Sequence, residues 1–397
     1  MKKIALVAAC DRYNYGDVLM PILFEEYYRI NGEQASFNYF ALSNADLRPV
    51  GGRITEPLYQ IDESYQYVIF VGGEILTPSY RGMYLNLQKN KLWIKILGKA
   101  STVYFPLVNW FCKVLMHGKY KNPWTFFAKS QHQHVLYNSV GGQEFSSMRE
   151  KNKDEIIELI KKSDLFSVRD NRTRDSILEY APGIRIDMIP DTAIIMSRIY
   201  SRDYLHTHIS NAISEALRSI NSYYVIQVNK VFGMGLTEEI ASAFKEIYNK
   251  TGMKCLLMPI SIVQGHEDDI PLKIIASKCP IESCYIGNTS ILDIMHIIAN
   301  ARAFVGTSLH GIITAASYCV PHSTITPNCL KLRSFIKSWG TSTVEYVEGE
   351  QGLIDYILEE NILLSVNNDR IYQMQENVQD YFNSIIEMID RSEEYYD

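Results

Sequence analysis

Acidic residues are missing from one long stretch of this 397-residue sequence. Residues 75–143 contain neither Asp nor Glu, although the whole chain carries 45 acidic residues and a net charge of −6. The same stretch holds Arg81 and eight lysines, so the remainder of the chain carries a charge of about −15. The sequence therefore describes one basic segment within an otherwise acidic molecule.

Cysteine pairs and long apolar runs are also missing. The seven cysteines are scattered without metal-type spacing, which argues against a disulfide framework or a zinc site and favours a reducing cytoplasm. No run approaches the roughly 18 apolar residues that cross a bilayer. The apolar run at the N-terminus ends at Asp11 and Arg12, which is short for a secretion signal and predicts a buried strand.

A dinucleotide-binding pattern is absent as well. The glycine turn after the first predicted strand, Tyr13-Asn14-Tyr15-Gly16-Asp17, lacks the G-x-G-x-x-G spacing. The turn therefore gives no case for a dinucleotide, and we expect no cofactor. The cysteine spacing likewise gives no case for a metal, and we expect none.

The basic stretch is rich in aromatic residues. It contains Trp93, Trp110 and Trp124, three of the four tryptophans in the chain. Tryptophan rings favour the headgroup level of a membrane, and lysines attract anionic lipid. We interpret residues 84–130 as a segment that contacts a membrane surface, with the protein peripheral at the inner face of the cytoplasmic membrane. A core helical hairpin with a solvated basic face is the alternative, whereas nucleic acid fits Trp-rich apolar runs poorly.

Alternating strand and helix patterns predict an α/β fold of two doubly wound, Rossmann-like domains that face a cleft. The first domain covers residues 1–200, with a helical insertion at about 84–134. Its strands are expected at 3–9, 67–71, 135–140, 165–168 and 184–189, and its helices at 18–31, 84–117, 151–162 and 171–180.

The second domain is expected over residues 201–365. A polar helix at about 198–220 precedes strands at 223–228, 254–259, 283–286 and 303–305, and helices at 236–250, 269–278 and 290–300. Residues 366–397 form a final amphipathic helix. A ligand is expected in the cleft between two such domains.

The most informative pattern is Gly306-Thr307-Ser308-Leu309-His310-Gly311. It predicts a strand end, a sharp turn and a helix of small residues, whose free N–H groups would form an anion site. His310 then stands beside that site, at the carboxyl edge of a sheet where α/β proteins bind ligands. The simpler interpretation is that His310 caps the helix. Lys331 and Arg333 follow in the sequence as cations for the same site.

Other polar residues follow predicted strands of the first domain. Arg169 comes after strand 165–168, and its guanidinium suits a carboxylate or phosphate, although a salt bridge to Asp170 is the alternative. Glu74 follows Gly72 and Gly73, and a hydrogen bond to a sugar hydroxyl and a structural turn are equally consistent with it.

Two further carboxylates stand at similar places. Asp17 lies in the glycine turn after the first strand, where it would contact a ligand or cap the following helix. Asp191 ends the strand expected at 184–189.

These segments, in this order, resemble the polysaccharide pyruvyl transferase family. The resemblance rests on Asn14-Tyr15-Gly16-Asp17, Gly72-Gly73, Ser167-Val168-Arg169-Asp170, Asp191-Thr192-Ala193, and Ser308-Leu309-His310-Gly311 with Pro321 and Lys331. It spans about residues 4 to 340. The chain departs from the pattern at Glu74, where many members have glycine, and at Ser308, where many have arginine. Residues 84–134 match no part of the family pattern.

The resemblance implies a fold like that of GT-B glycosyltransferases, with phosphoenolpyruvate as donor and a saccharide, often lipid-linked, as acceptor. The product would be a pyruvate ketal on a surface polysaccharide precursor. It implies His310 and Arg169 as catalytic residues. Donor binding falls to Lys331, Ser308, Gly311 and Arg333, and acceptor binding to Asp17, Gly73, Glu74 and Asp191.

Two other functions stay open at this stage. The same fold would serve a glycosyltransferase that uses a nucleotide sugar, although the sequence shows no convincing nucleobase pocket with an acidic ribose clamp. A catalytically inactive protein that binds glycan or membrane is the second alternative, which the loss of the arginine at Ser308 slightly favours.

Overall fold

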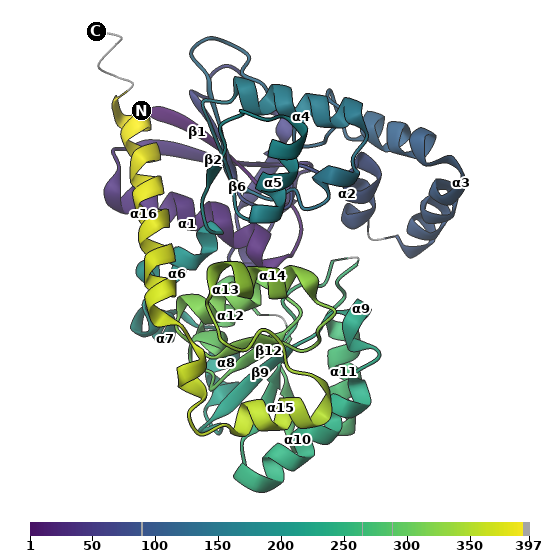
Figure 1. Cartoon of the computed structure of the whole chain (residues 1–397), viewed down its shortest axis with the longest axis vertical. Coiled ribbons are helices and arrows are strands. Elements are labelled where there is room, and N and C mark those ends of the chain that lie inside the picture. Colours follow the sequence, from purple (N-terminus) through teal and green to yellow (C-terminus); the bar gives the residue numbers. More distant parts are fainter. Residues whose placement is uncertain (89, 264, 288, 392–397) are drawn as a thin grey trace.

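The computed structural model describes residues 1–88, 90–263, 265–287 and 289–391. Two parallel sheets, each covered by helices, form two lobes that lie one above the other in Figure 1. The two-domain α/β fold of GT-B type expected from the sequence is therefore confirmed.

The sheet of the first lobe has eight strands, and only its edge strand β3 is antiparallel to its neighbour. Helices cover both faces of the sheet, and its central strand Tyr67–Val71 is a continuous apolar run that is buried at every residue. The spatial order is β3 (Ala45–Asp46), β4 (Ile54–Pro57), β2 (Ala35–Ala41), β1 (Lys2–Val7), β5 (Tyr67–Val71), β6 (His134–Val140), β7 (Leu165–Val168) and β8 (Asp187–Met188).

Different helices cover the two faces of this sheet. Helix α1 (Tyr15–Asn31) packs on one face, and α4 (Glu150–Lys162) and α5 (Asn171–Tyr180) pack on the other. Three short helices then lead to the second lobe: α6 (Met196–Ile199), α7 (Arg202–His208) and α8 (Asn211–Leu217).

The second lobe holds a fully parallel sheet of five strands. Their order is β11 (Ser283–Tyr285), β10 (Lys254–Leu257), β9 (Tyr223–Gln227), β12 (Phe304–Gly306) and β13 (His322–Thr324). Its helices are α9 (Lys230–Gly233), α10 (Thr237–Thr251), α11 (Asp269–Lys278), α12 (Ile291–Ala299), α13 (Leu309–Ser317), α14 (Leu330–Trp339) and α15 (Gly349–Leu358).

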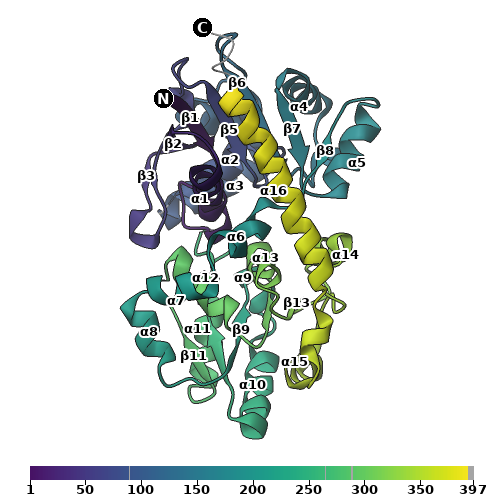
Figure 2. The ribbon, with the colours of Figure 1, turned by 90° about the vertical axis from the view of Figure 1, so that its left-hand side faces the viewer.

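The last helix, α16 (Asn368–Arg391), runs along both lobes (Figure 2). The side-chain amide of Gln375 donates to the Ser317 carbonyl of the second lobe, and the Tyr381 hydroxyl donates to Ser167 of the first sheet. Its apolar stripe joins one large core with residues from both lobes. The helix is therefore a strap that ties the end of the chain back to the first sheet.

The structure differs from the sequence expectations at several elements. Strands β2, β3, β4 and β13 were not anticipated, and the helix expected at 198–220 is three short helices. The strand expected at 184–189 is reduced to the two residues of β8. Short strands at the end of a sheet have little of the periodicity by which sequence patterns are recognised.

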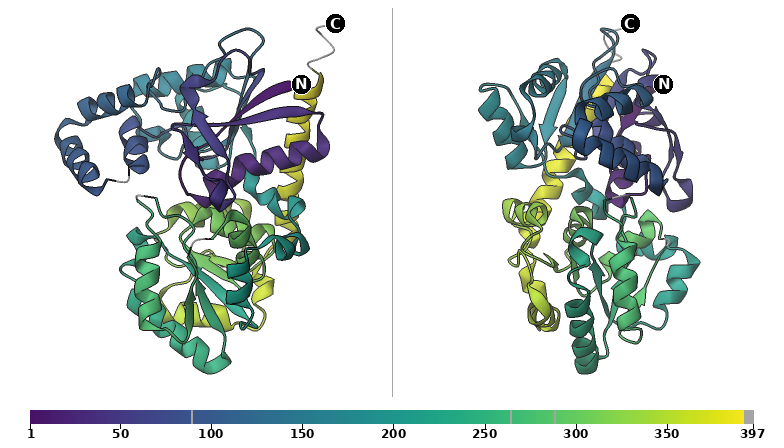
Figure 3. Two further views of the ribbon diagram at one scale, coloured as in Figure 1. Left: turned by 180° about the vertical axis from the view of Figure 1, so that it is seen from behind. Right: turned by 90° about the vertical axis from the view of Figure 1, so that its right-hand side faces the viewer.

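The insertion is helical only as far as residue 115. Helices α2 (Tyr80–Leu87) and α3 (Lys91–Leu115) project from the first lobe, as the view from behind in Figure 3 shows. Residues 116–133 have no helix, and Trp124 and Phe126 of that part are buried in the core of the first lobe. Helix α3 is kinked at Tyr104, two residues before Pro106, because proline disturbs the preceding turn.

Candidate active site

A cavity of about 240 Å³ lies between the two lobes, where the carboxyl ends of both sheets face each other. This is where open α/β sheets bind ligands. Residues from both lobes line it, among them Asp17, Glu74, Arg169, His266, Ser308, His310 and Lys331. Six of the ten residues singled out in the sequence therefore line one cavity.

A chain of charged groups runs along one wall of this cavity. The guanidinium of Arg169 donates to Asp191 at 2.8 Å and to Glu74 at 3.2 Å. The same oxygen of Asp191 lies 3.7 Å from Nε2 of His310, an ion-pair distance rather than a hydrogen bond. Glu74, Arg169 and Asp191 each follow a different strand, β5, β7 and β8, so the sheet brings them together.

The surroundings of Arg169 and Asp191 keep both side chains charged. Burial opposes ionisation of Asp191, but the contacts with His310 and Arg169 hold its pKa below the ordinary value. Burial likewise opposes the charge of Arg169, and its carboxylate neighbours nevertheless raise its pKa. Arg169 and Asp191 are therefore a charged pair with little exposure to water. The alternative partner of Arg169, Asp170, instead caps α5 by accepting from the Thr173 amide.

Two glycines have no side chain where the charged groups of the site need room. A Cβ added to Gly16 would lie 1.8 Å from Nδ1 of His310, so the imidazole rests on the first turn of α1. A Cβ on Gly141, which follows β6, would lie 2.5 Å from Oε2 of Glu74 and 3.0 Å from Nε of Arg169. The glycine turn after the first strand is thus an interlobe contact.

His310 does not cap its helix. Ser308 is the N-cap of α13, and its hydroxyl accepts from the Gly311 amide at 3.3 Å. His310 occupies the first turn with a side chain that is 12% exposed, and its Nε2 makes no hydrogen bond within the described residues. Gly311 is buried against Phe304, which lets the helix lie close to the sheet. The His310 side chain also lines the cavity, so a ligand bound there would lie beside it.

The two expected cations of α14 have different surroundings. Lys331 lines the cavity, and burial together with the charge of Arg169 lowers its pKa. No hydrogen bond or ion pair joins its ammonium to the described residues. Arg333 is instead paired with Glu345 at 3.3 Å and stacks on Tyr346. It is not among the residues that line the cavity.

The remaining expected residues lie on the side of the first lobe. Asp17 lines the cavity in the first turn of α1, where Asn14 and not Asp17 holds the N-cap position. Gly73 has a φ of +82°, a conformation that favours glycine, and it lies beside Asp17. Glu74 also accepts from the Gln143 amide, which fixes its orientation.

Three residues that line this cavity, Asp268, His266 and Trp124, were not among the site residues expected from the sequence. Asp268 accepts from the amides of Ile260 and Ser261, and burial raises its pKa to about 6. Burial lowers the pKa of His266, the second histidine of the site. A polar loop after a strand was the available signal for Asp268 and His266. Trp124 was expected at a membrane surface with the rest of residues 84–130, but it is buried and lines this cavity.

Among the described residues, none of the helices is long and apolar enough to cross a membrane. Within the same residues, no three His, Cys, Asp or Glu side chains come together as a metal site would require.

Three solved structures that share this fold at very low identity are described as UDP-N-acetylglucosamine 2-epimerases. A Listeria monocytogenes protein described as a UDP-N-acetylglucosamine 2-epimerase matches with a TM-score of 0.57 at 11% identity, over 98% of this chain and 97% of that one. The UDP-GlcNAc 2-epimerase of Methanocaldococcus jannaschii matches at 0.54 and 9%, over 95% and 99%. That of Neisseria meningitidis, bound to UDP-GlcNAc, matches at 0.53 and 12%, over 98% and 100%. At such identities the likeness shows the fold alone.

A search of curated protein sequences gives no match. The model of the polysaccharide pyruvyl transferase family, in contrast, matches residues 14–328. That range contains Asn14 and Gly16 at its start and His310 near its end, so it spans both walls of the cavity. The chain belongs to the polysaccharide pyruvyl transferase family.

Proposed function

We propose that this pyruvyl transferase takes phosphoenolpyruvate as donor and forms a pyruvate ketal on a sugar of a polysaccharide precursor. The observation that carries the proposal is the meeting of His310, the ammonium of Lys331 and the N-terminus of α13 in one cavity. The donor bears a carboxylate and a phosphate, and it needs cationic and N–H contacts of this kind.

His310 is the proposed acid and base. It would give a proton to the methylene carbon of the donor, which becomes a methyl group and leaves positive charge on the neighbouring carbon. A sugar hydroxyl attacks that carbon and returns a proton to His310. A second hydroxyl of the same sugar then displaces inorganic phosphate, which leaves with the remaining proton. General acid–base catalysis of this kind contributes roughly 10²–10⁴ in rate.

The carboxylates near His310 have separate proposed roles. Asp191 stabilises the protonated imidazole, because its ionised oxygen lies 3.7 Å from Nε2. Arg169 positions Asp191 and Glu74 and adds positive charge beside the donor. Asp17, Gly73 and Glu74 stand on the opposite lobe from His310, which suits contacts with the acceptor sugar. Ser308 would shape the donor end of the cavity, and Gly311, buried against Phe304, would let α13 lie close behind it.

The GT-B fold is equally compatible with a nucleotide-sugar glycosyltransferase, the first alternative. Two observations favour phosphoenolpyruvate over a nucleotide sugar. One is the family match, and the other is the Lys331 ammonium, which has no partner among the described residues. An inactive binding protein is a weaker alternative, because His310, Arg169 and Lys331 all line the same space.

Ligand-induced stabilisation tests the donor. A ligand at 100 times its Kd should stabilise the fold by about 2.7 kcal/mol. We expect phosphoenolpyruvate to raise the unfolding temperature, and UDP- and GDP-sugars to leave it unchanged. Release of phosphate and formation of a ketal with a saccharide acceptor complete the test. Stabilisation by a nucleotide sugar alone would overturn the proposal in favour of glycosyl transfer.

We further propose that α3 contacts an anionic membrane surface at the inner face of the cytoplasmic membrane, where a lipid-linked acceptor would be presented. One face of the helix packs on α2 through Leu97, Val108 and Cys112. Six apolar side chains on the rest of the helix are more than half exposed, namely Leu92, Val103, Tyr104, Leu107, Trp110 and Val114. Apolar exposure on this scale is typical of a contact surface.

Vesicle binding tests the membrane contact. We expect the protein to sediment with phosphatidylglycerol vesicles and less with phosphatidylcholine vesicles, because residues 75–143 contain no acidic side chain. The substitution Leu107→Ser with Trp110→Ser should abolish sedimentation. Leu363→Ser with Leu364→Ser is the matched control, because these residues are equally exposed far from α3. Equal loss in both variants would refute the assignment to α3.

A further inference from the structure

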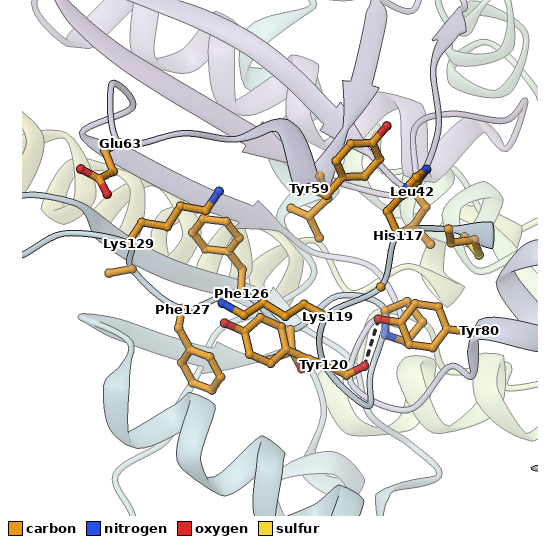
Figure 4. A pocket seen from close by; sticks show the side chains of 16 residues that line it. Leu42, Tyr59, Glu63, Tyr80, His117, Lys119, Tyr120, Phe126, Phe127 and Lys129 are labelled. Atoms are coloured by element: carbon orange, nitrogen blue, oxygen red, sulfur yellow. Dashed lines mark hydrogen bonds between the residues drawn. The ribbon is translucent and has the colours of Figure 1, made fainter. Parts of the chain in front are cut away.

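A second and larger cavity, of about 460 Å³, lies at the base of the helical insertion (Figure 4). Its volume is within the range of about 300–1,000 Å³ that small-molecule sites occupy. Strand ends of the first sheet, α2 and the segment after α3 all contribute to its lining. It is distinct from the cavity that holds His310, with which it shares no lining residue.

The floor of this cavity is apolar and its rim is basic. Leu42, Leu58, Tyr80 and Phe126 are buried at the floor. The rim carries the two exposed lysines Lys119 and Lys129, which Figure 4 shows with their ammonium groups directed over the aromatic rings.

The two lysines differ in how far their charge is satisfied. The Lys129 ammonium donates to the Ile61 carbonyl. The Lys119 ammonium lies 5.3 Å from the centre of the Tyr120 ring and makes no ion pair within the described residues. Glu63 is the single acidic residue of the lining, and it lies at the far end of the cavity from Tyr80 in Figure 4. The rim therefore carries net positive charge above an aromatic floor.

This second cavity lies between the cavity that holds His310 and the exposed apolar side of α3. Trp124 lines the cavity of His310, whereas its neighbours Pro123 and Thr125 line the second cavity, so this segment is a wall common to both. On another side the lining includes Met116, which follows the last residue of α3 and lies two positions after the exposed Val114.

We infer that this second cavity binds the phosphate end of a lipid, with the phosphate between Lys119 and Lys129 and the first hydrocarbon units on the aromatic floor. An ammonium rim suits phosphate, and an apolar floor suits the chain that follows it. A free phosphate would leave the floor unfilled, and an uncharged chain would leave the rim without a counter-charge. That this lipid is the carrier of the acceptor sugar rests on the proposed function, but the binding itself does not.

Calorimetric titration with soluble probes tests the site. Farnesyl diphosphate, below its micelle concentration, should bind at least tenfold more tightly than inorganic diphosphate and than farnesol. Dihexanoyl phosphatidylglycerol serves to tell an acceptor carrier from an ordinary membrane lipid as the source of the phosphate. We expect farnesyl diphosphate to bind more tightly than this phospholipid. Tighter binding of phosphatidylglycerol would overturn the link to an acceptor carrier, and equal binding of inorganic diphosphate would overturn the lipid site.

Variants locate the binding and separate it from catalysis. Lys119→Gln should weaken farnesyl diphosphate about tenfold, whereas Lys121→Gln should not. Lys121 is the matched control because it removes the same charge from the same segment, yet its ammonium bonds to the Lys151 carbonyl outside this cavity. His310→Ala should bind the probe as tightly as the native protein even if it transfers no pyruvyl group. Equal weakening by Lys119→Gln and Lys121→Gln would refute the site.

Discussion

A methyl group added to Gly16 is the sharpest test of how His310 is held. Gly16 lies in the first turn of α1 with ordinary helical backbone, so alanine is compatible with the chain itself. In an unobstructed helix this change stabilises by about 0.5–1 kcal/mol. Here the new Cβ would lie 1.8, 2.0 and 2.3 Å from three atoms of the His310 ring, and the ring would have to give way.

The size of the effect follows from that overlap. An ordinary contact needs about 3.4 Å, so the imidazole has to move by about 1.5 Å away from α1. A displacement of about 1 Å at a reacting group is worth roughly 10² in rate. We expect Gly16→Ala to lower the rate of phosphate release from phosphoenolpyruvate about a hundredfold, with little loss in unfolding temperature.

A double-mutant cycle shows whether the effect passes through the imidazole. Gly16→Ala should have no further effect on turnover in a His310→Ala protein, because the displaced group is then gone. Gly98→Ala is the matched control, since an added Cβ at that helical glycine meets nothing within 4 Å. Full turnover in Gly16→Ala would refute the proposed role of His310. The role would also be refuted if Gly16→Ala lowered turnover as much in the His310→Ala protein as in the native protein.

Three further predictions concern charged groups of the site. Lys331→Gln should raise the KM for phosphoenolpyruvate by about tenfold or more, since a charged hydrogen bond is worth about 1.5–3 kcal/mol. Arg333→Gln should leave this KM unchanged, because the Arg333 guanidinium is already paired with Glu345. Equal effects of the two substitutions would contradict the assignment of Lys331 to donor binding. Arg169→Met should lower the free energy of unfolding by about 3–5 kcal/mol in a urea titration, because it leaves the buried carboxylate of Asp191 without its arginine partner. Burial raises the pKa of Asp268 to about 6, so the folded state binds the proton more tightly and stability should fall by about 3 kcal/mol as pH rises from 4 through 6. Asp268→Asn should remove that part of the fall, and an unchanged pH dependence would show that another group titrates.

The membrane interpretation of the basic stretch rested on its residue types. In the structure, some of these residues are exposed on α3 and others are buried in the first lobe. Of its three tryptophans, Trp110 is 59% exposed on α3, whereas Trp124 is 1% exposed and lines the cavity that holds His310. Both belong to the same carboxylate-free run of sequence. Composition identified an unusual segment, but burial depends on neighbours that come from distant strands.

The sequence by itself determined the α/β class, the two lobes and most helices, because buried parallel strands and amphipathic helices have local periodicities. It also singled out Glu74, Arg169, Asp191 and His310 one by one, since each follows a strand end. Only the tertiary structure decided that Arg169 pairs with Asp191 and Glu74 and not with its neighbour Asp170. It alone placed Gly16 beneath the ring of His310, almost 300 positions away, and turned Arg333 out of the cavity. Pairings of this kind depend on strand order and on how one lobe meets the other, and no local pattern in a single sequence carries that information.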